Sequence, residues 1–85
     1  MELNTIKTLL EPAFAGGEVH VSGDGYHVQV IVVSDQFDGQ RSVKRQQLVY
    51  APLNAAISSG ELHALSIKAF TPTEWQRERK LLMPS

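Results

Sequence analysis

Three histidines carry the clearest capacity for chemistry in this sequence: His20, His27 and His63. Imidazole nitrogen is a ligand that zinc, copper, nickel and iron accept. His27 follows the Gly-Asp-Gly turn at 23–25, and His63 opens an alternating segment soon after Gly60. Histidines at the ends of neighbouring strands can approach each other, as a metal site requires. Two such ligands are too few for a closed site, so a partner would have to supply the rest. The competing interpretation is three exposed or structural histidines.

The chain contains no cysteine. This absence excludes disulfide bridges, a thiol nucleophile and any metal cluster that the chain holds through its own thiolates. Every metal ligand that the chain contributes must therefore be histidine or an oxygen donor, and the three histidines form a short list to test.

The carboxylates do not form a recognisable catalytic pair. Asp24, Asp35 and Asp38 lie where turn residues are expected, and the serines lack the glycines of a nucleophile elbow. Gly23 and Gly25 are not followed by the lysine and hydroxyl residue of a phosphate-binding loop. We therefore expect that the chain is not an enzyme.

Charge is unevenly distributed along the chain. Residues 1–40 contain one base and six acids, whereas residues 41–85 contain seven bases and three acids. Arg41, Lys44 and Arg45 cluster at the start of a predicted helix, where the helix dipole disfavours cations. A basic first turn is typical of a helix that contacts phosphates. A nucleic-acid-binding transcriptional regulator that uses these three residues is therefore the alternative function, and an ordinary solvated helix face is the competing interpretation.

The hydrophobic pattern predicts six elements that position these residues. They are a helix at 3–14, strands at 18–22 and 26–34, a helix at 43–58, a strand at 63–70 and a helix at 73–82. Residues 28–33 are all apolar except one glutamine, which is typical of a central strand. Pro52 lies inside the second helix and predicts a kink or a split near 49–50. Trp75 is the expected anchor of the last helix.

Polar residues near the expected helix starts are candidate caps. Asn4 or Thr5 suits the start of the first helix, and Ser42 suits the start of the second. Thr71 and Glu74 have the spacing of a capping box, which predicts that their side chains and backbone amides bind each other at the start of the last helix.

The element order α-β-β-α-β-α predicts an α+β fold, a two-layer sandwich whose three-stranded mixed sheet carries the helices on one face. Eighty-five residues suffice for one modest core, so 1–85 is expected to be a single domain with residues 83–85 frayed. No apolar run approaches the roughly 20 residues of a membrane span. The first residues are acidic and polar, unlike a secretion signal. We therefore expect a cytoplasmic protein without membrane contact.

Several stretches follow the pattern of a known family in collinear order over nearly the whole chain. They are Val19–His27 with Gln29-Val30, Phe37–Gly39, Val43–Tyr50 with Pro52-Leu53, His63–Pro72, and Glu74-Trp75 followed by Arg77 and Arg79-Lys80. The string from His63 to Trp75 is the most specific part. On these residues the chain resembles the BolA-like proteins, and it is most similar to their IbaG-type bacterial branch.

This resemblance implies a class II KH-like fold and partnership with a monothiol glutaredoxin. In that family the two proteins share a [2Fe-2S] cluster, for which glutaredoxin cysteine and glutathione supply sulfur and the BolA-type chain supplies histidine nitrogen; the isolated chain holds no cluster. The family's C-terminal histidine corresponds to His63. A second ligand comes from the loop between the first two strands, where His27 is the nearest candidate and His20 stays open. The implied role is iron–sulfur trafficking, or iron and stress sensing.

Two departures from the family pattern weaken a role in binding DNA. Many BolA-type chains have Arg-His-Arg in the second helix, where this chain has Lys44-Arg45-Gln46-Gln47. The Gly-x-x-Gly loop with which KH domains clamp nucleic-acid backbones is also absent from the sequence. The sequence leaves open whether the chain alone forms a homodimer, and whether its role is cluster delivery or regulation.

Overall fold

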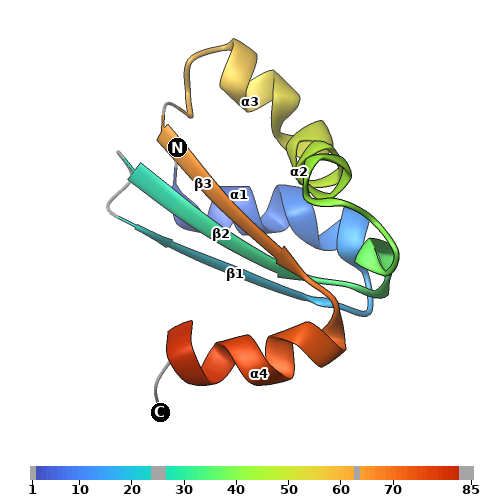
Figure 1. Ribbon diagram of the computed structural model, residues 1–85. Coiled ribbons are helices and arrows are strands. Elements are labelled where there is room, and N and C mark those ends of the chain that lie inside the picture. The colour runs from blue at the N-terminus through green and yellow to red at the C-terminus, as the bar shows by residue number, and fades with distance from the viewer. Residues whose placement is uncertain (1, 24–26, 63, 83–85) are drawn as a thin grey trace.

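Three strands form one mixed sheet at the centre of the fold (Figure 1). β1 (Glu18–Gly23) pairs antiparallel with β2 (His27–Val33), and β2 pairs parallel with β3 (Ala64–Phe70). The apolar β2 is therefore the central strand, as predicted. The computed structural model describes residues 2–23, 27–62 and 64–82. Most of the predicted turn at 23–25, His63 and the expected frayed residues 83–85 lie outside the described residues.

Three helices cover one face of this sheet (Figure 1). They are α1 (Leu3–Leu10), α2 (Ser42–Tyr50) and α3 (Asn54–Ser58). The main core lies between them and the β2 side chains Val28, Val30 and Val32, all fully buried. The other buried members of this core are Ile6, Leu10, Phe14, Val19, Phe37, Val49, Leu53, Ala56 and Leu62.

The last helix, α4 (Pro72–Leu82), lies against the opposite face of the sheet (Figure 1). Successive side chains of a strand point to opposite faces, so Ile31 and Val33 project away from the main core. Trp75 of α4 packs on both of them and is 3% exposed. The predicted α+β class, element order and three-stranded mixed sheet are confirmed. The placement of α4 differs from the expected one-sided cover, because Ile31 and Val33 present a second apolar surface that must also be buried.

The middle helical segment is divided at Pro52, as predicted. α2 ends at Tyr50, a 3-10 turn spans Ala51–Leu53, and α3 follows at once. Proline lacks the amide proton that a continuous helix would need at this point. No helix within the described part of the chain is long and apolar enough to cross a membrane.

The helix caps agree with the sequence at only one of the three predicted positions. α1 begins at Leu3 after Glu2, and no side chain caps it, so the prediction of Asn4 or Thr5 was wrong. Ser42 is already inside α2, where its side chain makes no cap bond, so that prediction was wrong too. Glu2 before α1 and Arg41 before α2 have extended backbone conformations, and neither makes a side-chain cap bond.

The capping box of α4 is confirmed. The Glu74 amide donates to Thr71 Oγ1 at 3.2 Å, and the Thr71 amide donates to Glu74 Oε1 at 2.9 Å. Two backbone amides that a helix start leaves without partners are thus satisfied reciprocally.

Candidate metal-binding site

His27 stands at the first residue of β2, and its side chain is exposed. A hydrogen bond of 3.1 Å joins its Nε2 to Ser66 Oγ on the neighbouring strand β3. The parallel register pairs His27 with Ala64, so the imidazole lies where β2 and β3 both begin. This end of the sheet is therefore where the chain presents a nitrogen donor between two adjacent strands.

His63 lies outside the described residues, and its role as a ligand stays a prediction. The residue that follows it in the sequence, Ala64, opens β3 and is the register partner of His27.

His20 occupies a different part of the sheet. It pairs with Ile31 on β2, four residues beyond His27, which is about 13 Å along the strand. Its Nε2 is 3.1 Å from Glu18 Oε1, and its ring centroid is 5.3 Å from that of Trp75. The structure therefore places His20 and His27 at separate positions along the sheet.

The described residues do not complete a metal site by themselves. No group of three or more histidine, cysteine, aspartate or glutamate side chains that could hold a metal is found among residues 2–23, 27–62 and 64–82. The donor that is present, an exposed imidazole, suits iron. A metal bound at this end of the sheet would therefore need further ligands from beyond the described residues.

Arg45, a candidate for nucleic-acid binding, is instead used within the fold. Its guanidinium lies between α2 and α4, where Nη1 donates to Glu74 Oε1 at 2.6 Å and Nη2 donates to Oε2 at 3.3 Å. Its Nε donates to the Gln40 carbonyl at 2.9 Å, and Nη1 also donates to the Ala69 carbonyl at 3.1 Å. The side chain is only 16% exposed. These contacts join elements that cover opposite faces of the sheet.

The other two basic candidates, Arg41 and Lys44, are exposed residues at the start of α2. The three basic side chains therefore do not form one exposed basic surface, because Arg45 is bound within the fold. Sequence reasoning missed the role of Arg45 because its acceptors lie 24 and 29 residues away along the chain.

The ion pair with Arg45 has an electrostatic consequence for Glu74. The hydrogen bond from the Arg45 guanidinium, together with the one from the Thr71 amide, lowers the pKa of Glu74 below its ordinary value of 4.5. Burial acts in the opposite direction but does not outweigh these two donors. Glu74 is therefore ionised over a wider acid range in the folded chain than in the unfolded chain.

Glu74→Gln is expected to lower the free energy of unfolding by about 1 kcal/mol at about pH 7. The amide keeps an oxygen for the Thr71 N–H but loses the charge that faces Arg45. Because the folded pKa is lowered, this contribution is complete above the ordinary value of 4.5 and is lost as the pH falls through the lowered pKa. Urea unfolding at about pH 7 and about pH 3 should show the difference from wild type shrinking in acid. An equal difference at both would contradict this role.

Comparison with known proteins assigns the chain to a family. A family model described as BolA-like protein matches residues 6–74. The chain belongs to the BolA-like family. This BolA-like chain is 56% identical to the protein named acid stress protein IbaG of Escherichia coli (strain K12) over 81 residues, which are 95% of this chain and 96% of that protein. The family predicted from the sequence is thus confirmed, and so is its similarity to the IbaG-type branch.

Solved structures of BolA-like proteins share the fold. A bolA protein homologue from Coxiella burnetii superposes on this BolA-like chain with a TM-score of 0.78 at 35% identity, covering 91% of this chain and 99% of that one. The BolA domain of SufE1 from Arabidopsis thaliana gives a TM-score of 0.74 at 36% identity, covering 85% and 93% respectively. The chain therefore shares its fold with BolA-like proteins whose structures have been solved.

Proposed function

We propose that this BolA-like chain is a cytoplasmic adaptor, not an enzyme, that binds a monothiol glutaredoxin and supplies histidine to a shared [2Fe-2S] cluster. His63 and His27 are the proposed ligands, and the glutaredoxin cysteine and glutathione supply the sulfur. The observation that carries this proposal is the register of His27 with Ala64, the residue directly after His63. It brings an exposed imidazole to the end of the sheet where the family's histidine is expected.

The chemistry of histidine suits a cluster that is passed on or sensed. Imidazole in place of thiolate reduces the negative charge around iron and raises the reduction potential of the cluster, as in Rieske centres. Histidine also accepts a proton near neutral pH, so it is released more easily than thiolate. Iron–sulfur trafficking or iron and stress sensing follows from a ligand of this kind. The name of the IbaG relative, an acid stress protein, supports the sensing role.

Ser66 has a positioning role in this proposal. Its hydroxyl lies 3.1 Å from His27 Nε2 and restrains the rotation of an otherwise exposed ring. Residues that orient a ligating histidine in this way commonly change metal affinity by about 10–100-fold when they are removed. Ser66→Ala should therefore weaken cluster retention without removing a ligand.

His27→Ala is expected to lower the iron content of the complex with a monothiol glutaredoxin and to change its visible circular dichroism. The loss removes one nitrogen ligand, while the fold should persist because the His27 side chain is exposed. The measurement is anaerobic reconstitution followed by iron analysis and visible spectroscopy.

His20→Ala is the matched control, since His20 is also a histidine on the sheet but lies about 13 Å further along the strands. It should leave the spectrum of the complex unchanged. If His20→Ala removed the cluster and His27→Ala did not, the assignment of the second ligand would be reversed.

A further inference from the structure

The imidazole ring of His27 is turned along the strands of the sheet. Its Nε2 lies 3.1 Å from Ser66 Oγ, and Ser66 is two residues beyond Ala64, the register partner of His27. Two residues of a strand span about 7 Å. Nε2 therefore faces inward along β3, away from the end of the sheet at which β2 and β3 begin.

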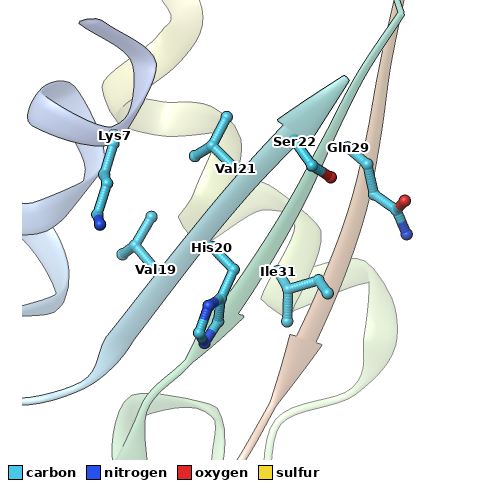
Figure 2. Close-up of a pocket in the computed structure, with 7 residues that line it drawn as sticks. All are labelled: Lys7, Val19, His20, Val21, Ser22, Gln29 and Ile31. Atoms are coloured by element: carbon cyan, nitrogen blue, oxygen red, sulfur yellow. The ribbon is translucent and has the colours of Figure 1, made fainter. Parts of the chain in front are cut away.

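Polar side chains surround this ring on the face of the sheet that α4 partly covers. His27 and Gln29 alternate with the core residues of β2, so they project to this face together. Figure 2 shows Gln29 and Ser22 on the side of the sheet opposite Val21. Ser22 and Ser66 are both register partners of Gln29, one on each neighbouring strand. His27 thus has a serine diagonally beside it on either strand, and its Nε2 contacts the one on β3.

The two nitrogens of the His27 ring face different directions. In an imidazole they lie on either side of Cε1, and the directions in which they form bonds diverge widely. A ring whose Nε2 faces Ser66 therefore turns Nδ1 away from Ser66. In the neutral ring one nitrogen carries the proton and the other carries the lone pair that a metal needs. Binding iron through Nε2 would break the contact with Ser66, whereas binding through Nδ1 preserves it.

We propose that His27 ligates the iron of the shared cluster through Nδ1, while Ser66 Oγ accepts a hydrogen bond from Nε2–H. Ser66 is thus a positioning residue that selects the tautomer with its lone pair on Nδ1. Metal-ligating histidines commonly donate their second N–H to an oxygen acceptor, which fixes both the tautomer and the orientation of the ring. This assignment rests on the proposed function and adds to it the atom that binds iron.

Nitrogen nuclear magnetic resonance of the histidine side chains tests the tautomer in the isolated chain. In mildly alkaline solution, where imidazole is neutral, we expect the His27 proton on Nε2. Ser66→Ala should raise the ratio of the Nδ1–H form to the Nε2–H form about fivefold, since it removes a hydrogen bond of ordinary net strength. Ser66→Thr, which keeps a hydroxyl, and Ser22→Ala, the matched control on the other strand, should keep the wild-type ratio. A wild-type ring protonated on Nδ1, or a ratio that ignores Ser66→Ala, would overturn the assignment.

Site-specific labelling of the mixed complex tests the ligating atom itself. The chain is prepared with histidine that carries ¹⁵N at Nδ1 alone or at Nε2 alone, combined with a monothiol glutaredoxin and reduced for pulsed electron paramagnetic resonance. His27→Cys replaces the imidazole with a thiolate, which iron also accepts, and identifies by difference the nitrogen coupling that belongs to His27. We expect this coupling to follow the Nδ1 label. A coupling that follows the Nε2 label would overturn the assignment and leave the proposed function standing, whereas the absence of a cluster from every chain would refute the proposed function on which the assignment rests.

Discussion

Replacing His63 with alanine is expected to remove most of the visible absorption and circular dichroism of the complex with a monothiol glutaredoxin. The substitution removes the nitrogen ligand that we propose for iron, and the chain has no cysteine that could take its place. Iron per complex should fall with the spectrum, while far-ultraviolet circular dichroism should keep its wild-type shape. A visible spectrum identical to wild type would refute the ligand role of His63.

A second substitution at the same position distinguishes a ligand from a structural residue. His63→Cys provides a thiolate, which iron also accepts, and should restore a cluster with a lower reduction potential than wild type. A merely structural histidine would not predict that a cysteine rescues the spectrum and shifts the potential. Rescue without any shift in potential would argue that iron is bound elsewhere.

Trp75→Ala is expected to release α4 from the sheet, at a cost of about 3–5 kcal/mol. Trp75 is 3% exposed and packs on Ile31 and Val33, and the centroid of its ring lies 5.6 Å from that of Phe70. Among the described residues, the side-chain hydrogen bonds that join α4 to the rest of the fold lie at its first turn, through Glu74. The main core lies on the opposite face, so α1, α2 and α3 should stay folded.

The release of α4 can be measured by amide chemical shifts in nuclear magnetic resonance spectra. Residues 72–82 should move to unfolded positions, while the amides of β2 and β3 stay dispersed. Leu81→Ala is the matched control on the same helix, because Leu81 is 78% exposed and should change stability by no more than about 0.5 kcal/mol. Cooperative loss of every element in Trp75→Ala would show that the two cores are not separable.

Local patterns in the sequence predicted the elements of the fold well. Alternation and β-branched residues identified the strands, Pro52 marked the division of the second helix, and Thr71 with Glu74 gave a capping box that the structure confirms. These features depend on residues close together in the chain. The position of α4 was not predicted, although the apolar run of β2 already required cover on both faces. A run of this kind shows that both faces are buried but does not show which helix buries each.

The candidate site was predicted only in part, because some of its contacts join residues that are far apart in the sequence. The sequence predicted that His27 and His63 stand at the ends of neighbouring strands, but the parallel register that pairs His27 with Ala64 is known only from the structure. The role of Arg45 could not be predicted, since a basic residue in a first turn is compatible with solvent, phosphate or a distant carboxylate. Only the approach of α4 to α2 brings Glu74 to it. Family resemblance, and not spacing, singled out His63 among the three histidines.

Pulsed electron paramagnetic resonance of the reduced mixed complex tests the proposed shared cluster most directly. The chain is labelled with ¹⁵N-histidine, combined with an unlabelled monothiol glutaredoxin, reconstituted anaerobically and reduced by one electron. We expect strong nitrogen couplings to the cluster that change from the ¹⁴N to the ¹⁵N pattern on labelling, and we expect the paramagnetic signal itself to be largely lost in His63→Ala, together with the cluster. A reduced cluster whose couplings are the same with labelled and unlabelled chain would contradict histidine ligation by this protein.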